Sequence, residues 1–545
     1  MMATMPGAGE QPERPRPPGS DSLSALPAGD PLSALPPPPL PPPPYLVAGL
    51  SRAGQAAVAA LTDIVAPESV RAWDTDTGRD MQHLRRRLEH AGVRTYLAPR
   101  LTRREVGFAR TIVKSPGVPF NAQVIDRALG KRRLVIDELE LGWRLTRAPV
   151  LGVTGTNGKS TVCGLTKTVL AAAGRRVALA GNTDFGQPLS AIGGRASDPA
   201  PLDWIVCEVS SFQLEGCVTF LPQLAVFTNL TPEHLGRHGT LERYGRIKRR
   251  MFITAERCVS RAVVDIDTAF GADLARDIER GGGRVRRVGA SSGAQYRVRS
   301  ASWDLRCAET VIDTPSGAAS IRSSLPGGYN ARNLAAALAA ADELGIERSV
   351  SLPALAGYPG TPGRFEHIDE GQPFAVIVDF AHSPDGMEQF LLTVRAGMDP
   401  AGRLIVVLGL GGAPGTNMYQ LGRLTAALSD QLVLTTSGFR GNPPIPTLQR
   451  IFAGARDVRS DVGLVLDRRR AFERGIALAS AGDVIVIPGR GALTDMRTDP
   501  HGRSRSFDDR EVVREILRTS LAARSPAPAG ARRISAMHVR PFPSR

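Results

Sequence analysis

The sequence predicts an α/β protein made of three domains, each built on a parallel sheet. Short apolar runs alternate with helical patterns along the chain, and this alternation is typical of parallel α/β sheets. At about 100–200 residues per domain, the 545 residues allow three domains. The strands are expected at 46–50, 70–73, 149–154, 202–209, 224–229, 374–380, 404–410, 431–435 and 483–487, with a helix at 54–61.

Proline and glycine mark the expected domain ends. Residues 1–44 contain the proline runs 36–39 and 41–44, and because proline lacks an amide donor we expect an extended, disordered leader. Residues 523–545 are rich in Pro, Ala and Arg and are expected to form a disordered tail. Between the leader and the tail, domain boundaries are expected near Arg147 and in the Pro- and Gly-containing segment 360–363. The expected domains are 45–147, 148–361 and 362–522.

The composition favours a protein of the cytoplasm. A hydrophobic content of 42% is ordinary for a globular chain. No stretch reaches the roughly 18 consecutive apolar residues of a membrane span, and the N-terminus lacks the apolar core of a signal peptide. The five cysteines lack metal-ligand spacing, which indicates reduced thiols.

The net charge of +15 raises the possibility of a nucleic-acid partner. Arginine is nevertheless spread along the chain, aromatic residues make up only 5%, and no nucleic-acid motif is present. We therefore expect no nucleic-acid partner. A solvated basic surface and a positive cleft for a polyphosphate both fit the charge, and the two are compatible.

A phosphate-binding loop is the most specific signal in the sequence. It follows the apolar run 150–153 and precedes a helical pattern. Glycines let the backbone approach an anion, and the helix N-terminus then faces the phosphates. A lysine supplies positive charge and a serine hydroxyl can bind Mg²⁺, although Val153 stands where the general pattern has glycine. The residues expected to bind ATP here are Gly155, Thr156, Asn157, Gly158, Lys159, Ser160 and Thr161.

The run TGTNGKST resembles the phosphate loop of the Mur ligase family and of the related folylpolyglutamate and cyanophycin synthetases. Segment 207–215, CEVSSFQLE, resembles the members that add glutamate to UDP-N-acetylmuramoyl-L-alanine, whereas 507–511 resembles the members that act next in the pathway. The resemblance spans residues 44–520. It implies a Rossmann-like N-terminal domain that binds the UDP substrate, a central P-loop ATPase-type parallel sheet, and a Rossmann-like C-terminal domain that binds the amino acid.

The resemblance also implies two Mg²⁺ sites. Glu208 stands where the family has a metal-binding glutamate, and Ser160 belongs to the same site. His234 would serve the second ion, although Glu233 and Gly236 depart from the aspartates of the family segment. Lys248 matches the lysine that the family carbamylates, and carbamylation by CO₂ would turn its ammonium into an anionic oxygen ligand.

Three further residues are implied to contact the nucleotide. Asn333, in a segment resembling the family's G-x-x-N-x-x-N helix start, would contact adenine. Arg364, in the hinge PGRFE, would reach the phosphates when the C-terminal domain closes. Asp379, in VIVDFAHSP with His382 beside it, would lie near the nucleotide.

The turns after the first strands resemble those that hold the UDP part of the substrate in the family. Taken alone, the segment 49–54 is a weak dinucleotide-type signal, and Ser51 replaces its middle glycine. The residues implied for this role are Arg52, Ala53, Asp74, Thr75, Ser115, Pro116, Gly117 and Asn182.

The amino-acid end of the site is where the resemblance weakens. Members that select diaminopimelate carry a DNPR segment after a late strand, and this motif is absent from 435–443. Ser437 and Arg440 could instead bind a small acidic amino acid, because hydroxyl and guanidinium groups both bind carboxylates.

The implied reaction joins a UDP-sugar peptide precursor to a free amino acid through an acyl phosphate, with Lys159, Lys248, His234 and Arg364 as catalytic residues. Glutamate is the expected amino acid and a monomer the expected state. Alternatives are a ligase of the diaminopimelate-adding type, or one of a specialised peptide, polyglutamate or cyanophycin-like pathway. A catalytically inactive nucleotide-binding scaffold is a further alternative, which the intact site residues disfavour.

Overall fold

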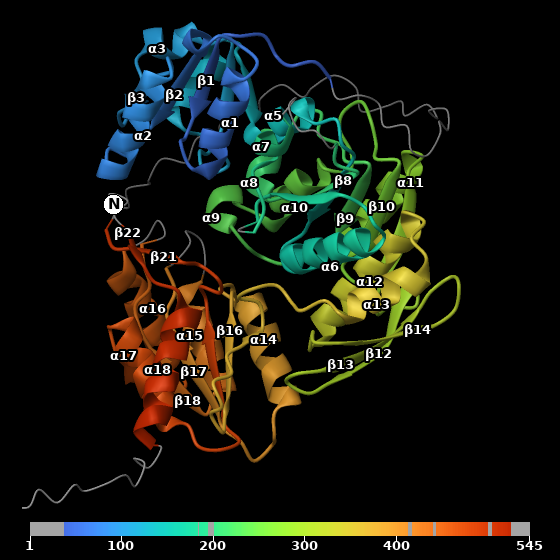
Figure 1. The fold of residues 1–545 in the computed structure, drawn as a ribbon, viewed down its shortest axis with the longest axis vertical. Coiled ribbons are helices and arrows are strands. Elements are labelled where there is room, and N and C mark those ends of the chain that lie inside the picture. The colour runs from blue at the N-terminus through green and yellow to red at the C-terminus, as the bar shows by residue number, and fades with distance from the viewer. Residues whose placement is uncertain are drawn as a thin grey trace, which may run out of the picture.

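The computed structural model describes residues 38–183, 185–193, 201–411, 417–439, 443–499 and 504–524. Most of the expected leader and tail lies outside these residues. Three α/β units follow one another along the chain, from the N-terminal unit at the top of Figure 1 to the C-terminal unit at the bottom. The α/β class with parallel sheets is thereby confirmed. Among the residues described, no helix is long and apolar enough to cross a membrane.

The N-terminal unit is a five-stranded parallel sheet in the order β3-β2-β1-β4-β5. Side chains alternate along β1, so Tyr45 and Val47 pack against α1 and α2 while Leu46 and Ala48 pack against α3 and α4. The strands are β1 (Tyr45–Ala48), β2 (Val70–Asp74), β3 (Arg94–Leu97), β4 (Thr111–Lys114) and β5 (Leu134–Asp137). The helices are α1 (Arg52–Thr62), η1 (Pro67–Ser69), α2 (Arg79–His90), α3 (Arg103–Phe108), α4 (Gln123–Gly130) and α5 (Glu138–Leu145).

The central unit contains a nine-stranded sheet in the order β14-β13-β12-β11-β10-β9-β6-β8-β7. Its parallel strands are β6 (Val150–Thr154), β7 (Val177–Gly181), β8 (Trp204–Glu208), β9 (Leu224–Phe227), β10 (Arg261–Asp265) and β11 (Arg284–Gly289). The antiparallel extension β12 (Tyr296–Trp303), β13 (Ala308–Asp313) and β14 (Ala319–Ser323) was not among the strands expected from the sequence.

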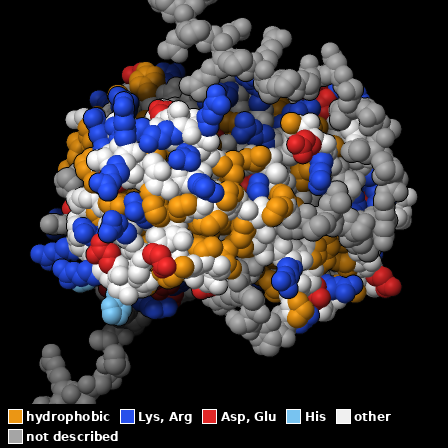
Figure 2. Space-filling model, turned by 90° about the horizontal axis from the view of Figure 1, so that it is seen from above, with side chains coloured by type: hydrophobic (Ala, Val, Ile, Leu, Met, Phe, Trp, Pro, Cys, Tyr) orange, Lys and Arg blue, Asp and Glu red, His pale blue; other side chains and the backbone are white. Residues whose placement is uncertain are grey.

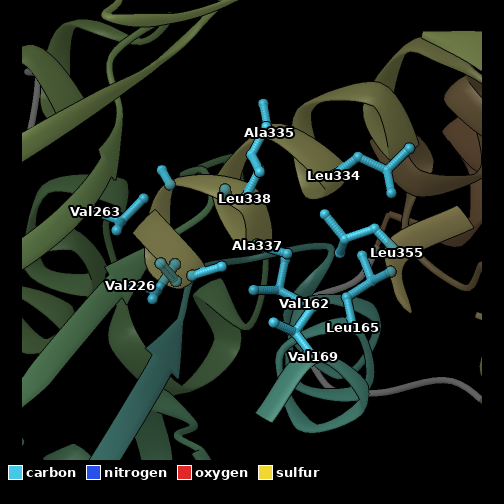
Figure 3. Close-up of a cluster of buried hydrophobic side chains, with 14 of the residues drawn as sticks. Val162, Leu165, Val169, Val226, Val263, Leu334, Ala335, Ala337, Leu338 and Leu355 are labelled. Atoms are coloured by element: carbon cyan, nitrogen blue, oxygen red, sulfur yellow. The ribbon is translucent and has the colours of Figure 1, made fainter. Parts of the chain in front are cut away.

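Helix α6 (Lys159–Ala172) packs against α12 (Gly328–Glu343) and α13 (Arg348–Ala356) over one face of this sheet, as Figure 3 shows. Small alanines on α12 allow a close approach, and the valines of α6 fill the space between the helices. The remaining helices are α7 (Leu189–Gly193), α8 (Ser211–Leu214), α9 (Leu235–His238), α10 (Leu241–Arg249) and α11 (Ala269–Arg280).

The C-terminal unit has a six-stranded sheet in the order β15-β16-β20-β17-β18-β19, in which only the short β15 is antiparallel. The strands are β15 (Glu366–His367), β16 (Ala375–Asp379), β17 (Leu404–Leu408), β18 (Gln431–Leu434), β19 (Gly463–Leu464) and β20 (Val484–Pro488), with a separate hairpin of β21 (Asp495–Arg497) and β22 (Ser504–Ser506). The helices are α14 (Pro384–Gly397), α15 (Met418–Leu428), α16 (Pro444–Arg456), α17 (Arg468–Leu478) and α18 (Asp509–Arg524).

A buried ion pair of the N-terminal unit lies where that unit contacts the central unit. Lys114, the last residue of β4, and Asp137, the last of β5, are fully buried with 2.6 Å between Nζ and Oδ2. The same ammonium donates to the carbonyl of Phe212 in α8 at 3.3 Å. Burial raises the pKa of Asp137 to about 6, against the lowering effect of Lys114. Removing the lysine would therefore leave a carboxylate without its counter-charge in a dry interface.

We expect Lys114→Met to lower the free energy of unfolding by about 3–5 kcal/mol, because a buried charge then loses its partner. Urea denaturation followed by circular dichroism measures the change. The double variant Lys114→Met/Asp137→Asn is the control, since it removes both charges, and it should recover part of the loss. A single variant as stable as the wild type would contradict the assignment.

Candidate active site

The phosphate loop connects β6 to α6, as the sequence predicted. Gly155 and Gly158 have φ values of 152° and 85°, a region that side chains disfavour. A Cβ on Gly155 would lie 1.9 Å from Thr228 Oγ1, and one on Gly158 would lie 2.4 Å from Asn333 Oδ1. Both positions therefore require glycine on steric as well as conformational grounds.

The residues after β9 hold this loop in shape. Thr228 Oγ1 donates to the carbonyl of Asn157 at 2.6 Å, and Asn229 Oδ1 accepts from the Asn157 amide at 2.8 Å. The Thr156 amide donates to the Asn229 carbonyl at 2.9 Å. These bonds fix the loop backbone, so the N-terminus of α6 can present its free amides to an anion.

Lys159 and Ser160 begin α6 and lie beside the loop. Lys159 Nζ donates to the carbonyl of Thr156 at 2.6 Å, which folds its charge back over the loop. Ser160 Oγ donates to Glu208 Oε2 at 2.7 Å, at the carboxyl end of β8. The structure thus brings together the serine and the glutamate expected to bind the first Mg²⁺. Asn182, expected in the UDP site, lies near the other oxygen of Glu208, with its Nδ2 3.4 Å from Oε1.

Lys248 is 1% exposed in α10, and its Nζ donates to the carbonyl of Gly155 at 2.6 Å. Burial, together with the charge of Lys159, lowers the pKa of Lys248 well below its ordinary value. His234 has a left-handed backbone with φ 55° at the start of α9, and its ring lies 4.8 Å from that of Phe212. Burial lowers the pKa of His234 and favours the neutral imidazole, the form that binds metal ions.

The donor set fits Mg²⁺ only in part. Within the described ranges, no three His, Cys, Asp or Glu residues lie close enough together to hold a metal ion. The Ser160 hydroxyl and the Glu208 carboxylate are hard oxygen ligands of the type that Mg²⁺ prefers. A bound ion would take its remaining ligands from phosphate oxygens, from water and from any carbamate on Lys248.

Asp385, which the sequence analysis did not single out, links the phosphate loop to the C-terminal unit. One of its oxygens accepts from Asn157 Nδ2 at 3.0 Å and from Thr231 Oγ1 at 3.1 Å. The sequence feature that could have indicated this residue was its position directly after the AHSP segment, residues 381–384. A carboxylate at the start of α14 therefore contacts the phosphate loop and the residues after β9 at once.

A second polar contact joins the same two units. His382 Nε2 lies 3.2 Å from Glu233 Oε1. Burial acts to raise the pKa of Glu233, but the hydrogen bond and charge of His382, with the charges of His234 and Lys159, hold it below its ordinary value. The glutamate that replaces the expected aspartate is thus an ionised partner of the C-terminal unit.

Three residues expected at the nucleotide take other contacts. The carboxylate of Asp379 accepts from the amides of Phe365 and Ala381 at 2.7 and 2.6 Å, which holds the hinge segment against β16. The Arg364 guanidinium lies 4.2 Å from the ring centre of Phe380. Asn333 is buried beside Gly158 and donates to Asn330 Oδ1. Their roles toward ATP stay predictions.

The expected UDP-binding turns lie at the carboxyl ends of β1, β2 and β4. Asp74 Oδ2 accepts from the Leu50 amide at 2.6 Å, and Ser115 Oγ donates to the Gly49 carbonyl at 2.7 Å. Arg52 Nη1 lies 3.4 Å from the Thr183 carbonyl of the central unit. The remaining candidates lie in the same turns or at the start of α1, and comprise Ala53, Thr75, Pro116 and Gly117.

The expected amino-acid residues are described only in part. Ser437 is 5% exposed in the segment after β18, and the next residues run beside β21, where the Phe439 amide donates to the Arg497 carbonyl at 3.1 Å. The side chain of Arg468, which is fully buried, contacts this segment by donating to the Thr436 carbonyl at 3.3 Å. The same guanidinium forms an ion pair with Asp509 at 2.5 Å. Arg440 lies outside the described residues.

A phosphate loop in a central sheet, closed over by a C-terminal α/β unit, defines a nucleotide-dependent enzyme. Residues 153–341 match the Mur ligase middle domain, and residues 363–491 match the Mur ligase glutamate ligase domain. The chain belongs to the Mur ligase family. It is accordingly an ATP-dependent, ADP-forming amide ligase that uses ATP and Mg²⁺.

The curated relatives carry the name UDP-N-acetylmuramoyl-L-alanyl-D-glutamate–2,6-diaminopimelate ligase. The protein of Thermosynechococcus vestitus is 34% identical over 399 residues, which cover 68% of this chain and 77% of the relative. That of Gloeobacter violaceus is 35% identical over 390 residues, covering 67% and 76%. These relatives do not support the expected closeness to the glutamate-adding members.

Solved structures share the fold at low sequence identity. The UDP-N-acetylmuramate–alanine ligase of Thermotoga maritima superposes with a TM-score of 0.56 at 17% identity, over 88% of this chain and all of that one. The folylpolyglutamate synthase of Mycobacterium tuberculosis gives a TM-score of 0.53 at 18% identity, over 71% and 94%.

We expect Asp385→Ala to lower kcat for ADP release by roughly ten- to a hundred-fold, because each hydrogen bond to a charged group contributes about 1.5–3 kcal/mol. The residue contacts the phosphate loop only when the C-terminal unit is close, so the loss should appear at saturating ATP.

Two variants complete this test. Asp385→Asn keeps an acceptor oxygen and should retain more activity than Asp385→Ala. Glu388→Ala removes an exposed carboxylate one turn further along α14 and serves as the matched control. Equal rates for Asp385→Ala and Glu388→Ala would show that the contact has no part in turnover.

Proposed function

We propose that this ligase adds an amino acid to UDP-N-acetylmuramoyl-L-alanyl-D-glutamate in the synthesis of peptidoglycan precursors. The observation that carries the proposal is the similarity to the diaminopimelate-adding ligases, which extends over two-thirds of this chain. The intact phosphate loop and the Ser160–Glu208 contact support an active enzyme. The turns at Gly49, Asp74 and Ser115 form a polar rim suited to the UDP group.

The chain's own residues neutralise charge in the first step, in which the acceptor carboxylate attacks the γ-phosphate of ATP and forms an acyl phosphate with loss of ADP. Lys159 and the amides at the start of α6 would face the phosphates. Arg364 would add positive charge when the C-terminal unit closes. The incoming amine then attacks the acyl carbon, forms the amide bond and releases phosphate.

Two Mg²⁺ sites would flank the phosphates, the first held by Ser160 and Glu208 and the second by His234 and a carbamylated Lys248. The ions would supply Lewis-acid stabilisation of the phosphoryl and carbonyl oxygens. Lys248 suits carbamylation because its buried amine has a lowered pKa, and the neutral amine is the form that reacts with CO₂.

The identity of the added amino acid is a separate proposal. The relatives are named as 2,6-diaminopimelate ligases, but the DNPR segment that goes with diaminopimelate selection is absent from residues 435–443. We therefore propose an amino acid other than diaminopimelate at this position, with glutamate as the specific candidate because Ser437 can bind a carboxylate. The CEVSSFQLE segment favours a second candidate, glutamate transfer to UDP-N-acetylmuramoyl-L-alanine. A specialised peptide pathway is the remaining alternative.

Mass spectrometry of products separates these candidates. Purified protein is given ATP, Mg²⁺, either UDP-N-acetylmuramoyl-L-alanyl-D-glutamate or UDP-N-acetylmuramoyl-L-alanine, and one amino acid at a time, including both glutamate enantiomers and diaminopimelate. We expect a new amide product with the dipeptide acceptor and no product from Lys159→Ala. Product with the monopeptide acceptor alone would support the second candidate, and product with neither acceptor would refute both.

We expect protein equilibrated with ¹³C-bicarbonate to show a carbamate carbon resonance in NMR, because burial lowers the pKa of Lys248 and so raises the share of the neutral amine that reacts with CO₂. Lys248→Arg keeps the positive charge but cannot form this carbamate, so the signal should disappear. Lys167→Arg on the outside of α6 is the matched control and should retain it. A spectrum without the resonance in the wild type would remove Lys248 from the proposed metal site.

A further inference from the structure

Part of the positive charge of the N-terminal unit is concentrated in one stretch of the chain, which runs from the end of β3 to the turn after α4. Apart from the buried Lys114, residues 100–133 contain eight basic side chains and two acidic ones. We call these eight the basic face; its members are Arg100, Arg103, Arg104, Arg110, Arg127, Lys131, Arg132 and Arg133. Figure 2 looks onto this end of the molecule and shows Lys and Arg side chains around an apolar area.

Contacts between α3 and the turn after α4 bring these residues together. Lys131 Nζ donates to the carbonyl of Arg103 at 3.0 Å, and Arg133 Nη2 donates to that of Gly107 at 3.5 Å. The Arg127 guanidinium donates to the carbonyl of Leu101. These acceptors are all neutral carbonyls, so the contacts gather positive charge without cancelling it.

Carboxylates do not neutralise the basic face. In the part of the chain that the structure describes, none of its eight side chains forms an ion pair. Of the two acidic residues, Glu105 accepts from the amide of Thr102 as part of a capping box on α3, and Asp126 lies on α4. Arg132 adopts φ 55°, a strained conformation that keeps a charged side chain where glycine would fit more easily.

Two exposed leucines border the basic turn. Leu129 is 42% exposed and Leu134 is 38% exposed, on either side of Lys131–Arg133. The turn lies at the amino end of β5, whereas the substrate turns lie at the carboxyl ends of the same sheet. A partner bound at this turn would therefore lie at the opposite edge of the sheet from the substrate turns.

We propose that the basic face docks this protein onto an anionic phospholipid bilayer. Basic side chains are attracted to anionic headgroups, and exposed leucines beside them can enter the interfacial region of a membrane. A single-stranded nucleic acid would need exposed aromatic rings for stacking. Phe108, the aromatic residue of α3, is instead covered by the Arg71 guanidinium at 3.5 Å.

Vesicle co-sedimentation of the full chain tests the proposal. The probes are vesicles of phosphatidylcholine alone and vesicles that also contain phosphatidylglycerol. We expect binding only to the second, and weaker binding at higher salt because salt screens surface charge. Arg104→Gln/Lys131→Gln/Arg132→Gln should weaken binding by about a hundred-fold, since each basic residue near an anionic surface contributes about five-fold.

The control Arg79→Gln/Arg86→Gln/Arg87→Gln removes the same charge from exposed positions on α2, which packs on the opposite face of the sheet. It should bind vesicles nearly as the wild type does. Leu129→Ser/Leu134→Ser should weaken binding without changing its salt dependence. All these variants should form ADP from soluble substrates at the wild-type rate, so loss of docking is distinguishable from failure of the proposed reaction.

Three results would overturn the proposal. They are equal binding to both kinds of vesicle, equal loss in the two triple variants, and binding to a DNA duplex that matches vesicle binding and depends on the basic face but not on the leucines. The last result would identify the basic face as a nucleic-acid surface.

Discussion

The phosphate loop keeps its conformation because the residues that follow β9 form hydrogen bonds with its backbone. Thr228 donates a hydrogen bond to the carbonyl of Asn157, and Asn229 accepts one from its amide. No side chain larger than hydrogen fits at Gly155, because Thr228 lies beside it. The loop backbone is therefore held in one conformation before an anion binds, and preorganised donors are a main means by which proteins stabilise developing charge. Lys248 reaches the same loop through the Gly155 carbonyl, so both lysines of the site depend on one short backbone segment.

The three units are joined in different ways. Backbone groups, and the buried Lys114 ammonium that donates to the Phe212 carbonyl, join the N-terminal unit to the central one. The C-terminal unit meets the phosphate loop through side chains, with Asp385 on Asn157 and His382 near Glu233. Polar side-chain contacts of this kind can open and re-form, which suits a unit that closes over bound substrates.

The sequence predicted what local patterns determine. Apolar runs and glycines locate the phosphate loop and nine of the parallel strands, whereas the parallel strands β3, β4, β5, β7, β10 and β11 and the antiparallel extension β12–β14 were missed. The contacts of Lys114 with Asp137 and Phe212, and of Asp385 with Asn157, bridge residues far apart in the chain and leave no periodic signal. Substrate choice was least predictable, because the segment after β18, where we expect the amino acid to bind, lacks the DNPR motif.

The buried ammonium of Lys114 connects the turn expected to bind the UDP substrate to the segment that follows Glu208. Lys114 directly precedes Ser115 in the turn expected to hold the UDP group, and Phe212, whose carbonyl it binds, lies four residues after Glu208. A displacement of the Ser115 turn would therefore act on the segment that leads back to Glu208, the glutamate beside Ser160. Occupancy of one substrate site can in this way alter the affinity of the other, and by linkage the effect is the same in both directions.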